Sequence, residues 1–155
     1  MSHCCSQIIS DNHACPECGQ TGMHVQAITL RHTLKQGSRN KVDDSAPYYF
    51  CAAPQCNVVY FSENSEIFTL NALINRVSQK DPSAQTPLCY CYKITKGDVL
   101  EQIAINGQTD VINVIKQHMS QTPCFCQKSN PQGVCCIDHV ETWLHQNRLI
   151  SIAAE

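Results

Sequence analysis

The apolar residues of the first half of the chain follow the spacing of strands. Residues 23–30 partly alternate between apolar and polar side chains, and residues 48–51 and 58–61 are rich in aromatic and β-branched residues. Both features are typical of β-strands. Apolar residues at 67–74 predict a strand or a short extension, whereas the polar residues 35–47 predict a loop. The pattern predicts a small β module.

The second half follows the spacing of helices. Apolar residues between 99 and 104 and between 111 and 119 recur at intervals of three and four, and a third stripe lies at 140–144. Thr95 with Asp98 resembles a capping arrangement at the start of the first helix. Asn106-Gly107 predicts its end, and Thr109 can cap the next helix. The expected fold class is therefore α+β.

Composition narrows the possible functions. The 155 residues carry a net charge of −2 and only 15% charged residues, so nothing indicates a nucleic-acid partner. No signal peptide and no apolar run of membrane-spanning length is visible, which predicts a cytoplasmic protein without membrane insertion. Twelve cysteines are the unusual feature. In a reducing compartment they favour metal binding or redox chemistry over disulfides.

The first pattern of chemical interest is a pair of cysteine knuckles. Cys15 and Cys18 frame Pro16-Glu17, and Cys51 and Cys56 form a second knuckle about 30 residues later, between strand-like segments. Two such knuckles joined by strands are typical of a zinc ribbon, in which four thiolates close a structural tetrahedral Zn²⁺ site. The alternative is a redox Cys-x-x-Cys of the thioredoxin type, which requires a βαβ context that the pattern lacks.

A second set of six cysteines lies within 48 residues of the helical half. Cys89-Tyr90-Cys91 opens the set, and the remaining four are Cys124, Cys126, Cys135 and Cys136. Cys-x-Cys lets two thiolates reach one metal centre from one loop, and a second loop would complete four ligands. Four thiolates fit either a [2Fe–2S] cluster or a closed zinc site. Spacing alone leaves open which two of the last four take part.

These cysteines and a polar stretch with two prolines at 80–87 predict the organisation of the chain. We expect a flexible Cys/His tail at 1–14, a zinc-ribbon-like module at 15–80, a linker at 81–88 and a helical cluster module at 89–155. Vicinal Cys4 and Cys5 in the tail form a possible soft-metal site for Cu(I), which prefers thiolates; the alternative is a tail with incidental thiols.

Several of these motifs occur in the order of a known family. They are Cys15-Pro16-Glu17-Cys18, Tyr49-Phe50-Cys51, Val58-Val59-Tyr60-Phe61, Cys89-Tyr90-Cys91 and Asn130-Pro131-Gln132-Gly133-Val134-Cys135-Cys136. The sequence resembles the N-terminal zinc- and [2Fe–2S]-binding domain of the archaeal-type copper chaperone CopZ. Its cluster half also resembles bacterioferritin-associated ferredoxin. The resemblance implies cluster ligands Cys89, Cys91, Cys126 and Cys135, and zinc ligands among Cys15, Cys18, Cys51 and Cys56.

The resemblance also implies a role. Family members that deliver copper carry a separate copper domain with a Met-x-Cys-x-x-Cys loop, which these 155 residues lack. We therefore expect a non-enzymatic electron-transfer protein of copper or heavy-metal handling, with Cu(II) to Cu(I) reduction as a specific possibility. Its partners would be metal ions and a redox or copper-handling protein. The alternative is a two-site zinc-binding interaction module without redox activity.

Overall fold

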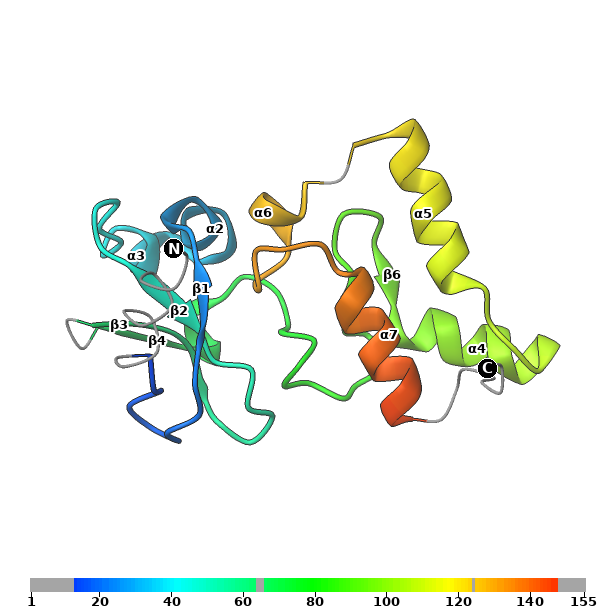
Figure 1. The fold of residues 1–155 in the computed structure, drawn as a ribbon, viewed down its shortest axis with the longest axis horizontal. Helices are drawn as coiled ribbons and strands as arrows, with labels where there is room; N and C mark the ends of the chain where they lie inside the picture. The colour runs from blue at the N-terminus through cyan, green and yellow to red at the C-terminus, as the bar shows by residue number, and fades with distance from the viewer. Residues whose placement is uncertain (1–12, 64–65, 124, 148–155) are drawn as a thin grey trace, which may run out of the picture.

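The computed structural model describes residues 13–63, 66–123 and 125–147. An antiparallel sheet and its two short helices occupy one end of the molecule, and the longer helices occupy the other (Figure 1). The elements in chain order are β1 (Met23–Val25), α2 (Ala27–Thr33), α3 (Gln36–Arg39), β2 (Tyr48–Phe50), β3 (Val58–Ser62), β4 (Ile67–Thr69), the 3-10 turn η1 (Leu70–Ala72), β5 (Pro87–Cys89), β6 (Ile94–Thr95), α4 (Lys96–Asn106), α5 (Val111–Gln121), α6 (Cys126–Ser129) and α7 (Ile137–Gln146).

The first four strands form one sheet in the order β1-β2-β3-β4, with every neighbour antiparallel. Side chains of successive strand residues point to opposite faces. Tyr48 and Phe50 of β2 accordingly join the core that includes Leu30 and Leu34, whereas Tyr49 faces the other side and packs near the first cysteines. Both faces of this small sheet are therefore covered, one by α2 and the other by the cysteine loops.

The expected strand at 23–30 is correct only up to Val25. From Ala27 the chain forms α2, because Leu30 and Leu34 lie four residues apart and are both fully buried against the sheet. That spacing is helical, and the burial of one face outweighs the partial alternation of the preceding residues. The short helix α3 likewise lies within the segment expected to be a loop. The strands expected at 48–51 and 58–61 are observed as β2 and β3.

The helices of the second half enclose a separate core. Val99, Ile115, Val140 and Leu144 pack there with Leu88 of β5. The capping box predicted from two residues is present at the start of α4, where the side chain of Thr95 accepts from the amide of Asp98 and the Asp98 side chain accepts from the amide of Thr95. Gly107 ends α4 at φ 80°, and the Thr109 hydroxyl accepts from the amide of Val111 at the start of α5.

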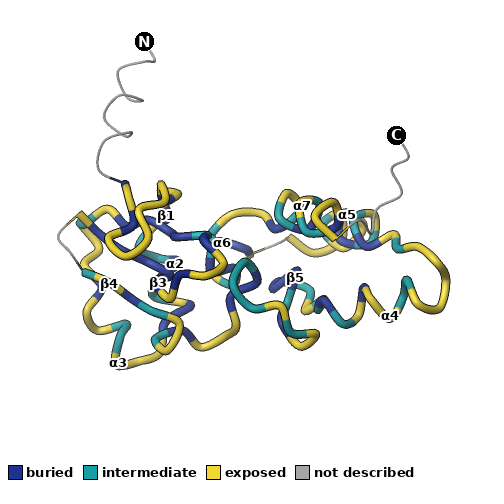
Figure 2. Tube along the Cα trace, turned by 90° about the horizontal axis from the view of Figure 1, so that it is seen from below, coloured by how far each residue is buried: buried dark blue, intermediate teal, exposed yellow. Residues whose placement is uncertain are grey.

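Hydrogen bonds join the two halves. The hydroxyl of Tyr60 in β3 donates to the carbonyl of Pro131, and the Thr29 hydroxyl in α2 donates to the carbonyl of Gln127 in α6. α6 packs directly against α2, which holds the cysteine-rich loop of the second half against the β module (Figure 1). Of α6 only Cys126 is buried, whereas the tube is buried along much of the sheet and in β5 (Figure 2).

The overall order is the one expected: an antiparallel β module followed by helices, an α+β fold. The boundaries of the expected modules stay predictions. Within the expected linker 81–88, Thr86 and Leu88 are fully buried, and β5 begins at Pro87. None of the helices in the described ranges is long and apolar enough to cross a membrane.

Candidate metal centres

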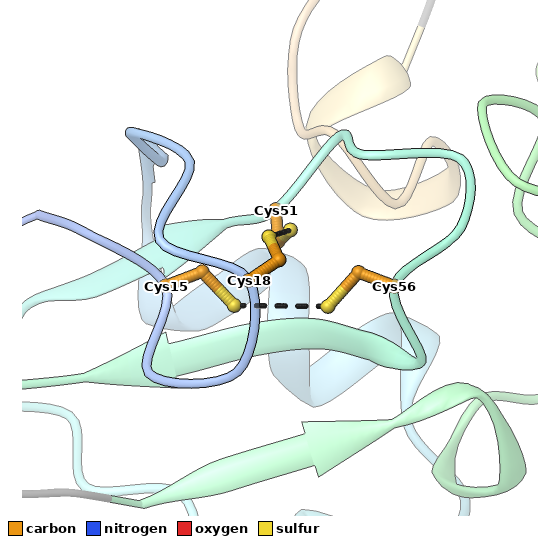
Figure 3. Close-up of side chains that lie close together, drawn as sticks. All are labelled: Cys15, Cys18, Cys51 and Cys56. Carbon is orange, nitrogen blue, oxygen red and sulfur yellow. Dashed lines mark hydrogen bonds between the residues drawn. The ribbon is translucent and has the colours of Figure 1, made fainter.

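Four cysteines of the β module converge on one point. Cys15 and Cys18 lie in the loop before β1, Cys51 follows the end of β2, and Cys56 precedes β3 (Figure 3). Their sulfur atoms all lie within 4.8 Å of one another, with 3.8 Å between Cys15 and Cys56 and 3.6 Å between Cys18 and Cys51. Zinc–sulfur bonds of about 2.3 Å in a tetrahedron place the sulfurs about 3.8 Å apart. The four thiols therefore fit a closed zinc site.

Backbone turns aim these thiols at the centre. The amide of Gly19 donates to the carbonyl of Cys15 over 2.8 Å, and Gly19 takes a φ of 79°, a left-handed conformation that glycine adopts at little cost. In the second knuckle the amide of Cys56 donates to the carbonyl of Ala53 over 3.2 Å. Both knuckles are thus shaped by local sequence and held together by strands β2 and β3.

Burial affects whether these thiols keep their protons when no cation is bound. Cys15, Cys51 and Cys56 are buried and Cys18 is exposed. Loss of water raises the pKa of the Cys51 thiol to about 12 and also raises that of Cys56. A hydrogen bond from the Gln20 backbone, with smaller contributions from neighbouring thiols, lowers the pKa of Cys18. A divalent cation that displaces the thiol protons is what this group of side chains requires to become four thiolates.

A second group of thiols lies in the helical half. Cys89 ends β5, Cys91 follows it, Cys126 begins α6 and Cys136 precedes α7; all four are buried and pack in the same core. The sulfurs of Cys91 and Cys126 are 3.3 Å apart. Hydrogen bonds with Cys126 and Cys89 raise the pKa of the Cys136 thiol. The hydrogen bond with Cys136 lowers the pKa of the Cys89 thiol.

One cysteine that the resemblance implies as a cluster ligand lies apart from this buried group. Cys135 is exposed and lies outside this core, whereas the adjacent Cys136 is only 2% exposed and reaches Cys89 and Cys126. The two adjacent side chains thus face different ways, and Cys136 is the one that faces inward. The reason is the start of α7 at Ile137, which turns Cys136 toward the helical core. Cys4, Cys5 and Cys124 lie outside the described residues.

Two further groups contact Cys91. The amide of Phe125 donates to its sulfur over 3.1 Å, and the hydroxyl of Ser129 lies 3.2 Å from the same sulfur. Sequence reasoning overlooked both, since neither residue type marks a site by itself. The signal that was available is their position, one residue before and three residues after Cys126 in a short turn of helix.

Comparisons with known proteins agree with the first site. Residues 12–74 match the CopZ zinc-finger family, described as a zinc binding domain. The chain is 32% identical over 127 residues to the copper chaperone CopZ of Archaeoglobus fulgidus; the match covers 82% of this chain and 59% of that protein. The X-ray structure of the Archaeoglobus fulgidus CopZ N-terminal domain superposes with a TM-score of 0.71 at 31% identity, covering 83% of this chain and 95% of that one. This chain therefore belongs to the CopZ family, as a metal-binding protein with a zinc-binding domain, in which Cys15, Cys18, Cys51 and Cys56 lie close enough together to hold a metal ion.

Proposed function

We propose that this protein is a non-enzymatic electron-transfer protein, in which Cys89, Cys91, Cys126 and Cys136 hold a [2Fe–2S] cluster next to the structural zinc site. The proposal keeps three of the ligands that the family resemblance implies and takes Cys136 in place of Cys135. The observation that carries it is the gathering of four buried thiols from three separate segments into one core.

The arrangement of these thiols favours a binuclear group over a single ion. Within the part of the chain that the structure describes, only the zinc cysteines form a compact group with all ligand atoms close to one another. In the second set the sulfurs of Cys91 and Cys126 are 3.3 Å apart, and Cys136 interacts with both Cys126 and Cys89. Two bridged irons require two pairs of thiolates, whereas one zinc ion requires a tetrahedron. This argues against the two-site zinc module.

The surroundings of Cys91 also suit an anionic centre. Burial raises the pKa of its thiol to about 12, so a free Cys91 keeps its proton and a bound metal would displace it. The Phe125 amide and the Ser129 hydroxyl then remain as hydrogen-bond donors to the sulfur. Such donors stabilise the more negative, reduced state of a cluster and raise its reduction potential.

When bound, a [2Fe–2S] cluster supplies one-electron transfer. The relative from Archaeoglobus is named a copper chaperone, which supports a role in copper or heavy-metal handling. The reaction would be oxidation of the reduced protein by one electron and reduction of Cu(II) to Cu(I). Cys4 and Cys5 remain candidates to receive the Cu(I) product, and the partner would be a redox or copper-handling protein. The chain spans 59% of that relative's length, so each of these roles is a proposal for this chain.

Iron and sulfide analysis after anaerobic, iron-replete reconstitution tests the cluster. We expect about two irons, two sulfides and one zinc per chain, with the absorption of a [2Fe–2S] protein and an electron paramagnetic resonance signal after reduction. Zinc in both sites and no sulfide would instead establish the two-site zinc module.

A matched pair of variants tests the ligand assignment. Cys136→Ser should abolish or strongly shift the cluster spectrum, and Cys135→Ser should leave it nearly unchanged, because only Cys136 lies in the buried group. The opposite result would return the assignment to Cys135. Anaerobic addition of Cu(II) to the reduced protein tests the redox role: the oxidised-cluster spectrum should return as Cu(I) forms, and a cluster that stays reduced would rule that role out.

A further inference from the structure

A lysine from outside the zinc-binding domain lies on the second zinc knuckle. The ammonium group of Lys80 donates to the carbonyl of Ala53 over 2.7 Å and to the carbonyl of Cys56 over 3.0 Å. Both carbonyls belong to the turn between the zinc ligands Cys51 and Cys56. The region that matches the zinc binding domain family ends at residue 74, before Lys80.

The charge of Lys80 complements the site that it touches. Four thiolates around one Zn²⁺ carry a net charge of −2, and such a centre is stabilised by nearby cations and by groups that orient its ligands. Lys80 places such a cation on the site, since its ammonium group donates to the backbone carbonyl of the ligand residue Cys56.

The second half of the chain fixes the segment that carries Lys80. The amides of Lys80 and Asp81 both donate to the carbonyl of Val77, whose side chain is fully buried in the β core. Lys96, at the start of α4 and 4% exposed, donates to the carbonyls of Ser78 and Asp81 over 2.8 and 2.7 Å. Lys80 is thus held between the core of the β module and a buried lysine of the helical half.

From this geometry we infer that Lys80 is a positioning residue of the zinc site, which holds the Cys51–Cys56 turn and supplies the positive charge that its thiolates require. The zinc site then depends on the segment that joins the two halves and is not complete within residues 12–74. This inference concerns the zinc centre alone and stands whether or not the second cysteine set holds a cluster.

The inference is tested by measuring the zinc affinity of the full chain in competition with a chromophoric chelator. The zinc binding that is lost in Cys18→Ser is assigned to this site. Changes in groups that support metal ligands typically lower metal affinity 10–100-fold. We expect a loss of this size for Lys80→Met and near-normal affinity for Lys80→Arg, which keeps the charge and the donors. Lys41→Met is the matched control, since Lys41 is an exposed lysine of the same half.

Salt separates the charge from a purely structural role. Interactions between partly exposed charges are screened at high ionic strength. The difference in zinc affinity between wild type and Lys80→Met should therefore become smaller as the salt concentration is raised. If Lys80→Met does not fold, Lys80→Gln is used for the same comparison. Wild-type affinity in these variants, or an equal loss in Lys41→Met, overturns the inference; a gap that is independent of salt overturns the part that assigns a charge to the site.

Discussion

Tyr60 offers the sharpest test of how the two halves are joined. Its ring is fully buried in the β core, and its hydroxyl donates to the carbonyl of Pro131 over 2.6 Å while lying 2.9 Å from the hydroxyl of Thr33. Burial raises the pKa of this phenol well above its usual value, so the hydroxyl remains a donor at every pH of interest. Tyr60→Phe removes the oxygen and leaves the ring in place.

The cost of that change follows from what each former partner retains. The Thr33 hydroxyl still donates to the carbonyl of Thr29 over 2.9 Å, so it stays satisfied. The carbonyl of Pro131, a buried residue, loses the donor from Tyr60. A buried acceptor left without its partner costs about 1–3 kcal/mol. We expect Tyr60→Phe to lower the free energy of unfolding by this amount.

Urea unfolding of the metal-loaded protein, followed by circular dichroism, measures the effect. With a slope of about 2 kcal/mol per molar urea, a loss of about 2 kcal/mol lowers the midpoint by about 1 M with the slope unchanged. Tyr92→Phe is the matched control: its hydroxyl donates to the carbonyl of Thr122 over 2.6 Å, but that hydrogen bond is exposed to water. It should cost less than about 0.5 kcal/mol, because water replaces the lost partner. Equal effects of the two substitutions would refute the reasoning.

Three more outcomes are expected. Cys18→Ser should release zinc and unfold the β module, because metal binding supplies folding free energy in such small units; a zinc-free variant with unchanged thermal unfolding would contradict this. Burial, assisted by Lys96, lowers the pKa of His139 from 6.5 to about 4, so the unfolded state binds more protons between these values and stability falls as pH drops through them. The loss from this residue is about 2 kcal/mol between pH 7 and pH 5, and the stability gap between wild type and His139→Gln in urea titrations should shrink by that amount; a constant gap would disprove the assignment. Gly133→Ala should destabilise the chain by about 1–2 kcal/mol, because Gly133 has a φ of 79° and a Cβ there would lie 2.9 Å from the Thr29 hydroxyl; thermal unfolding equal to wild type would show that the loop relaxes freely.

The features that local sequence determines were predicted well. Knuckle spacing identified the four zinc cysteines that the structure brings together, and the aromatic and β-branched residues identified β2 and β3. The capping box at Thr95 and the stop at Gly107 also depend only on neighbouring residues, and both are observed.

Features that depend on distant contacts were not predictable in this way. Whether Cys135 or Cys136 faces the core depends on the path of the loop into α7, which spacing cannot show. The strand expected beyond Val25 is a helix because Leu30 and Leu34 meet the face of a sheet formed later in the chain. In the sequence, Lys80 and Lys96 are indistinguishable from ordinary surface lysines. Only the fold shows that both donate to backbone carbonyls distant in the sequence.

The bonds between the halves have an asymmetry that bears on how the family can diverge. In the bonds from Thr29 and Tyr60, the β module contributes side chains and the loop contributes the backbone carbonyls of Gln127 and Pro131. The side chains of Gln127 and Gln132 also reach the β module, at Gln26 and Met23, but these contacts are exposed to water. A carbonyl is present whatever residue occupies the position, so the cysteine-rich loop can change its side chains without losing these two bonds. Mutational drift should therefore concentrate on the loop, while the two donors of the β module tolerate little. For protein engineering, loops with new ligand sets are best grafted onto this β module with Thr29 and Tyr60 retained.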